Sequence, residues 1–577
     1  MSALHENSPH LRTGAHKASP ADAAFCPLCG RRADAVLLEL NRKLEPHIAR
    51  FLRAKHSHWH EAQGACPRCV LDAVAAMHQR RRADSVQHEL QLPYPVYSHD
   101  ETALLATPYR MHAYPQFTGR GVVMAFLDSG FYPHPDLTKP YNRILAHADA
   151  TIKEPIERPN FRRPAVTSWH GLMTTCVAAG NGFLSGGKFR GIAYNAQLVL
   201  VKTGNRRGRH IREDDIYRAL NWIIQHQHRF NLRVVNLSVG GDNPSDGTLS
   251  ALDELVEEAS ARGIVVVCAV GNSGTSQVVP PASAPSAITV GGLDDRNSLE
   301  RARHRLYHSN YGRGGYHKAK PDVIAPALWV PAPMLPETWV YNEGQYLWKL
   351  LHAPDDELQT LLQTRQAQNT FKKETLHLPL DEIRRVIRSR MIEQKYIHAH
   401  YQHVDGTSMA APIVSAVVAQ MLEANPSLTP AQIEKILQDT ARPLEHFPRA
   451  NQGYGVLNAP HAVAYALRAP NGALANFPLS PQVHSDHVEF VYYDVKAKHV
   501  FVVGDWNGWK PHAHRLHERA SGVWHGTMPR PAPGLHAYKF LVEREGQRLW
   551  RGDPENLRRV EDGAGEFYSL LEVGGKR

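Results

Sequence analysis

The sequence contains no run of about 18 apolar residues, which is the length that a membrane-spanning helix requires, so we predict no membrane partner. The N-terminal stretch MSALHENSPHLRTGAHKASP lacks the apolar core of a secretory signal. No internal repeat or low-complexity tract is present, and cysteine is scarce, with 6 in a chain of 577 residues. Together these features predict a cytoplasmic protein.

The composition is typical of a globular protein, because 42% of the residues are hydrophobic and 21% are charged. A chain of this length is too long for one core and predicts about two to four domains. The formal net charge is +10, but Lys and Arg are spread along the chain and interrupted by Asp and Glu. We therefore interpret the charge as a basic solvated surface and expect no nucleic-acid partner. The sequence leaves the oligomeric state open.

Four of the six cysteines form two similar turns, CPLC with Cys26 and Cys29, and CPRC with Cys66 and Cys69. Two such turns supply four thiolates that can close tetrahedrally on a zinc ion. We therefore predict a structural zinc site within an N-terminal module of residues 1–85, and no organic cofactor. A redox dithiol pair or disulfides are the alternatives, but neither requires two matching Cys-Pro-x-Cys turns.

The same module has two stretches with apolar residues at helical spacing, 35–54 and 69–90, so we expect two helices. A module this small lacks a core of its own, and metal binding would supply its folding energy. A group of histidines, His56, His58 and His60, lies between the two turns. We interpret it as a solvated polar turn, with a further metal ligand as the alternative.

The middle of the chain alternates short apolar segments with amphipathic ones. GVVMAFLDSG (121–130) is an apolar, β-rich run that ends in Asp-Ser-Gly, as a buried parallel strand does. The segments AQLVLVKT, RVVNLSVGG, GIVVVCAVGNSG and SAITVGG are further short strands, and DDIYRALNWIIQHQ and LSALDELVEEASARG between them have helical periodicity. This alternation predicts an α/β domain with a parallel sheet flanked by helices.

Four motifs follow one another along this domain. FLDSG contains Asp128, WHG contains His170, AVGNSG contains Asn272 and GTSMAAP contains Ser408. The order Asp, His, Ser is one of the known orders of a catalytic triad. With the supporting segments HSNYG, KPDVIAP and GYGVLNA, residues 104–467 resemble the catalytic domain of the subtilisin-like serine peptidases.

The resemblance implies a serine endopeptidase that acts on a protein or peptide substrate through an acyl-enzyme. Ser408 would attack, His170 would take its proton and Asp128 would hold the imidazole, because a serine hydroxyl is a poor nucleophile without a base. Asn272 and a backbone N–H at the start of the Ser408 helix would bind the oxyanion. The resemblance also assigns residues to the edges that pair with an extended substrate. These residues are Leu237, Ser238, Val239, Gly240, Ala269 and Gly271.

Two departures from the family pattern concern metal binding and regulation. The calcium-binding loop expected after the His170 helix is not recognisable in NGFLSGGKFR, so we predict no calcium. The connection between Pro326 and Gly406 is far longer than this fold needs. The resulting insertion, at about 327–400, contains the amphipathic stretches PDDELQTLLQTRQ and PLDEIRRVIRSRMIEQKYI. It is either a lid that shapes the substrate cleft or a surface decoration.

The C-terminal part alternates apolar and polar residues with period two, in HVEFVYYDVKAKHVFVVGDWNGW and GVWHGTMPRPAPGLHAYKFLVE, which predicts an all-β sandwich over residues 484–577. Through VVGDWNGW, PGLHAYKFLVE and LWRGDP it resembles the glycogen-binding early-set carbohydrate modules. The resemblance implies that Trp509, Lys539 and Trp550 contact an α-glucan such as glycogen, since aromatic faces pack on pyranose rings. Such modules also act as protein-interaction domains.

The predicted organisation is therefore multidomain. It comprises a small helical zinc module (1–85), a linker (86–103), the α/β peptidase domain (104–467), a second linker (468–483) and the β-sandwich (484–577). Two classes of function compete. The first is an intracellular serine endopeptidase whose terminal modules localise it or select substrates, and the second is a catalytically inactive adaptor that binds glucan or protein. The complete set of triad and oxyanion residues favours the peptidase.

Overall fold

The computed structural model describes residues 23–34, 38, 46–66, 69, 73, 104–158, 161, 163–165, 167–204, 211–561 and 567–574. The chain divides into two compact units, Met1–Gln91 and Leu92–Arg577. The predicted helix 69–90 and the predicted linker 86–103 lie outside the described residues, apart from positions 69 and 73.

The first unit contains a small hairpin and a helix. Strand β1 (Ala23–Phe25) pairs antiparallel with β2 (Arg32–Asp34), and Gly30, with a φ of 66°, lies in the turn between them. Helix α2 (Pro46–Lys55) forms the C-terminal part of the first predicted helix. It begins with proline, which suits that position because the first N–H of a helix has no intrahelical partner. A short 3₁₀ turn, η2 (Glu61–Gln63), follows.

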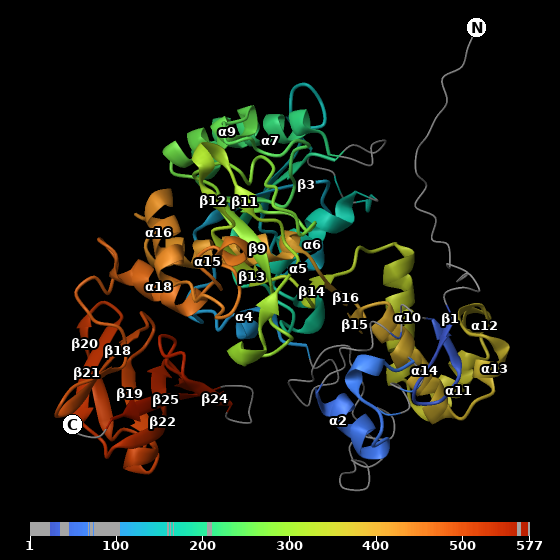
Figure 1. The fold of residues 1–577 in the computed structure, drawn as a ribbon. Coiled ribbons are helices and arrows are strands. Elements are labelled where there is room, and N and C mark those ends of the chain that lie inside the picture. Colours follow the sequence, from blue (N-terminus) through green and yellow to red (C-terminus); the bar gives the residue numbers. More distant parts are fainter. Residues whose placement is uncertain are drawn as a thin grey trace. The chain divides into compact units, whose positions relative to one another are not determined.

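The second unit contains a 9-stranded, mostly parallel sheet (Figure 1). The strand order is β10, β9, β8, β7, β3, β6, β4, β5, and β13 pairs with β9 outside this path. The strands are β3 (Val123–Asp128), β4 (Ile144–Asp149), β5 (Ile156–Glu157), β6 (Gln197–Lys202), β7 (Leu232–Leu237), β8 (Val265–Ala269), β9 (Ile288–Asp294), β10 (Arg305–Leu306) and β13 (Val323–Pro326). Only β5 and β10, at the two edges, run antiparallel to their neighbours in this sheet. The predicted α/β fold is confirmed.

Helices cover both faces of this sheet, which is why its central strands are apolar throughout. Helices α7 (Glu213–Gln225) and α9 (Ala251–Ala261) share a core with one face. The other face is covered by α6 (Ser168–Ala179), α15 (Thr407–Ala424), α16 (Pro430–Thr440) and α18 (Ala459–Arg468). By length and composition α15 could pass for a membrane span, but 83% of it is buried inside the protein. Its apolar character therefore serves the core.

Shorter elements connect these parts. They are α4 (Thr107–Arg110), α5 (Pro135–Thr138), η3 (Phe183–Ser185), α8 (Gln227–Phe230), η4 (Arg301–Arg303), β11 (Gly312–Arg313), η5 (Gly315–His317), β12 (Ala319–Lys320) and α17 (Arg449–Gln452).

The insertion is a helical subdomain with an apolar core of its own. Its base is a 3-stranded antiparallel sheet of β14 (Val330–Pro333), β16 (Tyr401–Val404) and β15 (Tyr396–His398). The helices are α10 (Trp339–His352), α11 (Asp355–Leu362), α12 (Arg365–Thr370), α13 (Lys373–Leu376) and α14 (Leu380–Glu393). Helices α11 and α14 match the two predicted amphipathic stretches, whereas α10 was not predicted.

The C-terminal domain is an antiparallel sheet that curls around a core, as expected for an all-β domain. The strand order is β17, β18, β21, β20, β19, β22, β25, β24, with β23 paired to β22. The elements are β17 (Gln482–Val483), β18 (His487–Tyr493), β19 (His499–Gly504), η6 (Asp505–Asn507), β20 (His514–Ala520), β21 (Val523–Pro529), β22 (Gly534–Arg544), β23 (Gln547–Arg551), β24 (Arg559–Glu561) and β25 (Phe567–Val573). Alternate residues of β18, β19 and β22 form the core, which explains the period of two in the sequence.

The C-terminal domain is packed firmly against the peptidase domain. Leu474, in the predicted linker 468–483, is fully buried in the core of the peptidase domain. The Arg468 guanidinium, at the end of α18, donates to both carboxylate oxygens of Glu555 at 2.9 and 3.0 Å, and both side chains are largely buried. The backbone N–H of Ser480 donates to the same carboxylate at 2.8 Å. The linker is therefore an ordered part of the interface.

Candidate functional site

The aspartate of the first motif, Asp128, ends β3 and is completely buried. Its carboxylate lies 2.8 and 2.9 Å from Nδ1 of His170. It also accepts hydrogen bonds from the N–H of Ser129 at 2.7 Å and from the hydroxyl of Thr174 at 3.0 Å. Because a carboxylate only accepts, the network assigns the imidazole proton to Nδ1 and leaves Nε2 free to take another proton.

The histidine lies in the first turn of α6, with 21% of its side chain exposed. Burial opposes a charge on His170, but the Asp128 carboxylate and its hydrogen bond raise the pKa of the imidazole above its ordinary value. Gly171 follows because α6 passes very close to the loop after β3. A Cβ at this position would lie 2.1 Å from the carbonyl oxygen of Gly130. The glycine after His170 is thus required for α6 to pack close enough to β3 for His170 to contact Asp128.

The serine of the last motif is the second residue of α15, directly after Gly406 and Thr407. The Asn272 side-chain oxygen accepts hydrogen bonds from the N–H and the hydroxyl of Thr407, at 2.8 and 2.9 Å. A Cβ on Gly406, whose φ is 128°, would lie 3.5 Å from Asn272 Nδ2 and 3.8 Å from the backbone nitrogen of Ser408. Asn272 Nδ2 and the backbone nitrogen of Ser408 therefore both lie close to Gly406. An oxyanion hole requires two donors of this kind.

A series of hydrogen bonds between buried polar side chains holds the backbone at Ser408. The Ser238 hydroxyl donates to the Ser408 carbonyl at 3.0 Å, and the Asn236 amide donates to the Ser238 hydroxyl at 3.1 Å. The Ser415 hydroxyl donates to Asn236 Oδ1 at 3.0 Å. This chain ties β7 to α15. Asn236 and Ser415 were not singled out in the sequence, although each is a polar residue within an apolar run.

The loop of Asn272 is held by Asn310 from the HSNYG segment. Asn310 Oδ1 accepts the N–H of Ser273 at 2.7 Å. A Cβ on Gly271, whose φ is 107°, would lie 2.9 Å from Asn310 Nδ2. The glycine lets this amide approach the backbone, and the approach fixes the direction of the neighbouring Asn272.

The predicted substrate-binding residues follow the carboxyl ends of β7 and β8, which are neighbouring parallel strands. Leu237 is fully buried in the core, so only its backbone can face a substrate. A Cβ on Gly240 would lie 2.9 Å from Cγ2 of Val279, and the Gly241 N–H donates to the Pro280 carbonyl at 2.6 Å. Ala269 ends β8. The contacts of Gly240 and Gly241 thus pack the segment after β7 against residues 279–280.

The four cysteines of the N-terminal unit lie together, with their sulfur atoms within 4.8 Å of one another. The Cys26–Cys69 and Cys29–Cys66 sulfur separations are 3.9 and 3.8 Å. A tetrahedral zinc ion with bonds of about 2.3 Å separates its sulfur ligands by about 3.8 Å. All four are free thiols. The cluster therefore fits a metal ion, and it is not a pair of disulfides.

The cluster also needs a cation to hold four negative charges. Burial opposes ionisation of Cys26, but backbone N–H groups, that of Cys66 included, lower its pKa to about 7. Burial and the neighbouring sulfur atoms raise the pKa of Cys69. A bound metal would offset this mutual repulsion.

In the C-terminal domain, the three predicted sugar-contacting residues belong to one face of the sheet. Lys539 pairs with Val503, and Trp550 pairs with Leu541 two positions further along β22. Trp509 packs on this face against a cluster that contains Val503 and Leu541. Trp550 is 39% exposed, whereas Lys539 is only 4% exposed. The two tryptophans can therefore offer ring surface directly.

A further aromatic residue, Tyr568, joins this face. Its ring lies 5.0 Å from Trp509, edge to face, and 4.9 Å from Nζ of Lys539. No role for Tyr568 was predicted from the sequence. The face thus combines three aromatic rings with one ammonium group.

Comparison with known proteins finds two matching families. A family model described as the subtilase family matches residues 119–456, and one described as carbohydrate-binding module 48 (isoamylase N-terminal domain) matches residues 478–555. Serine protease AprX of Bacillus subtilis is 28% identical over 354 residues, which are 60% of this chain and 67% of that protein. Subtilisin BL of Lederbergia lenta is 27% identical over 328 residues, 57% of this chain and 86% of that protein. The first match includes all four motif residues.

Proposed function

The chain belongs to the subtilase family of serine peptidases, and on that premise we propose that it hydrolyses peptide bonds through Asp128, His170 and Ser408. The observation that carries the proposal is the double contact between the Asp128 carboxylate and His170 Nδ1, at 2.8 and 2.9 Å. It holds the imidazole as a base with Nε2 available. An adaptor without activity would have no need of this arrangement.

In the proposed reaction, Ser408 Oγ attacks the scissile carbonyl while its proton passes to Nε2 of His170. The oxyanion accepts hydrogen bonds from the Ser408 N–H and from Asn272 Nδ2. His170 then gives the proton to the leaving amine, and an acyl-enzyme remains. Water attacks this ester by the same route, with His170 as base, and releases the second product. Asp128 stays ionised throughout and stabilises the imidazolium.

Labelling with a fluorophosphonate probe tests this proposal, with Ser408→Ala as the matched control. We expect covalent labelling of the parent protein and none of the variant, because only an activated serine displaces fluoride. Equal labelling of both proteins, or of neither, would count against Ser408 as the nucleophile.

For the N-terminal unit we propose structural zinc, held by Cys26, Cys29, Cys66 and Cys69. The sulfur separations of 3.8 and 3.9 Å support it. Free thiols persist in reducing compartments, so this site also supports a cytoplasmic location. Metal analysis of the purified protein should find about one zinc per chain. A zinc-free protein with a fully folded N-terminal unit would refute the assignment.

For the C-terminal domain we propose binding of an α-glucan, as a second function beside proteolysis. The match to carbohydrate-binding module 48 and the shared face of Trp509 and Trp550 support it. Co-sedimentation with amylopectin tests the idea, and Trp550→Ala should lose most of the retention. If the parent protein stays in the supernatant, the domain is better explained as a protein-interaction module.

A further inference from the structure

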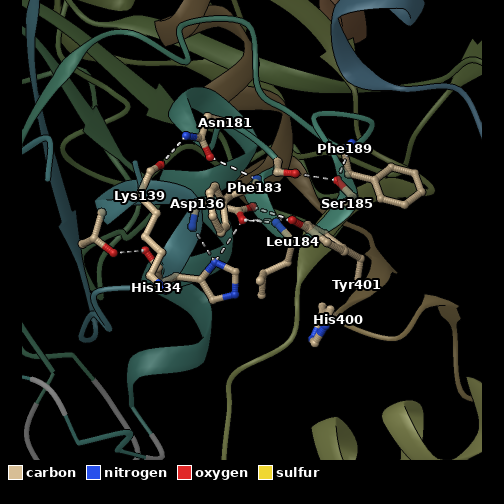
Figure 2. Close-up of polar contacts among 12 residues, drawn as sticks. His134, Asp136, Lys139, Asn181, Phe183, Leu184, Ser185, Phe189, His400 and Tyr401 are labelled. Carbon is tan, nitrogen blue, oxygen red and sulfur yellow. Dashed lines mark hydrogen bonds and ion pairs between the residues drawn. The ribbon is translucent and has the colours of Figure 1, made fainter. Parts of the chain in front are cut away.

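A buried tyrosine of the insertion binds a buried aspartate that lies eight residues after Asp128 in the sequence. Tyr401, the first residue of β16, is fully buried, and its hydroxyl lies 2.9 and 2.8 Å from the two carboxylate oxygens of Asp136 in α5 (Figure 2). Asp136 is also fully buried. Burial and the Asp136 charge raise the pKa of Tyr401, so the hydroxyl stays protonated and donates. The bond is a charge-assisted one, removed from water.

Asp136 also holds the segment that leaves the helix of His170. Its backbone carbonyl accepts the N–H of Asn181 at 3.0 Å, and its carboxylate accepts the N–H of Leu184 at 3.4 Å. The Asn181 side chain donates to the Lys139 carbonyl at 2.6 Å, also visible in Figure 2. Since α6 ends at Ala179, these bonds fix the position of its C-terminal end.

On the other side, Tyr401 is tied closely to the nucleophile. It lies seven residues before Ser408, in a strand held by pairing with β14. Directly after β16, the Asp405 carboxylate accepts the N–H of Trp329 at 2.9 Å, and the Gly406 N–H donates to a backbone carbonyl at 2.7 Å. The segment from Tyr401 to Ser408 therefore has little freedom of its own.

One hydrogen bond thus joins three segments: the loop after Asp128, the segment that follows the His170 helix, and the strand that leads to Ser408. We propose that the bond between Tyr401 and Asp136 is a positioning contact, through which the docked insertion aligns the triad for peptide hydrolysis. This inference rests on the proposed peptidase activity. Tyr401 is not a catalytic residue, because it acts through Asp136. A misplacement of about 1 Å far from the chemistry can cost about 100-fold in rate.

The test compares Tyr401→Phe with Tyr396→Phe. Tyr396 is a matched control, because it is also a buried tyrosine of the insertion whose hydroxyl donates to a carboxylate, that of Glu343 at 2.9 Å. With a fluorogenic peptide, we expect kcat of Tyr401→Phe to fall at least about tenfold with KM nearly unchanged. Tyr396→Phe should keep kcat within about twofold of the parent, since its bond does not touch Asp136.

Both variants lose one buried hydrogen bond, so their melting temperatures should fall by similar amounts. Equal kcat values for the two variants, measured well below both melting temperatures, would overturn the positioning role. If Tyr401→Phe does not fold, Asp136→Asn and Asp136→Leu replace it. The Asn carbonyl still accepts the Tyr401 hydroxyl and should keep kcat within about threefold, whereas Leu should lose at least about tenfold. Equal turnover by these two would also overturn the role.

Fluorophosphonate labelling of the parent separates the two proposals. An unlabelled parent would overturn the peptidase mechanism together with this contact. A labelled parent with a fully active Tyr401→Phe variant would overturn the contact alone.

Discussion

Replacing Asn272 by alanine tests the oxyanion hole most directly. The substitution removes Nδ2, one of the two donors proposed for the oxyanion hole; it lies close to Gly406, as the backbone nitrogen of Ser408 does. Loss of one such donor raises the barrier by about 2.7 to 4 kcal/mol. At about 1.36 kcal/mol per tenfold change, kcat should fall about 100- to 900-fold. Because the oxyanion forms only in the transition state, KM should change little.

The assay is steady-state hydrolysis of a fluorogenic peptide, with fluorophosphonate labelling in parallel. Labelling should persist at a reduced rate, because Ser408 and His170 are intact. Thr407→Val is the control, since it removes a hydroxyl that donates to the Asn272 oxygen at 2.9 Å but keeps the backbone N–H bond at 2.8 Å. Its effect should be much smaller than that of Asn272→Ala. A fall in kcat of less than about fivefold for Asn272→Ala would refute the reasoning.

Four further predictions concern the site and the cysteine cluster. His170 must be neutral to accept a proton and its pKa is raised, so kcat/KM should fall as pH decreases through a value above the ordinary histidine pKa of about 6.5, which a pH profile of the parent protein checks. Asp128→Asn should lower kcat about 10⁴-fold in the same peptide assay. Gly171→Ala should destabilise the domain by more than about 3 kcal/mol in denaturant unfolding, because its Cβ would lie 2.1 Å from the Gly130 carbonyl oxygen. Cys66→Ser should reduce bound zinc to near zero by mass spectrometry, because three thiolates bind more weakly than four.

The sequence predicted the peptidase fold, because each motif combines a residue type with a local backbone requirement. The catalytic roles of the motif residues stay predictions. Gly171 and Gly406 show this: one permits a close helix approach and the other has a φ of 128°. Helix α10 was not predicted, and its sequence contains Gly344, a poor helix former. The structure gives the reason for this glycine: a Cβ there would lie 2.8 Å from Cε of Met334.

Contacts between distant parts of the chain could not be predicted. Tyr401 and Asp136 are 265 positions apart, and no local pattern indicates their bond. The polar chain from Asn236 to Ser415 also depends on how β7 packs on α15. The stretch 468–483 was interpreted as a linker from its Pro, Ala and Asn content, yet its Leu474 is buried in a shared core. The composition of a segment indicates only its local conformational preference. Whether the segment is buried depends on the distant residues that pack against it.

The ordered junction between the peptidase and C-terminal domains has a consequence for how substrates are reached. The buried ion pair of Arg468 and Glu555 and the shared core join the two domains through a packed interface. A flexible tether would let the active site sweep through a range of distances from an anchored polymer. Here the buried contacts between the two domains set the position of the Trp550 face relative to Ser408. An enzyme anchored by that face would cleave only those polypeptides that reach its active site at one distance and in one orientation from the anchor.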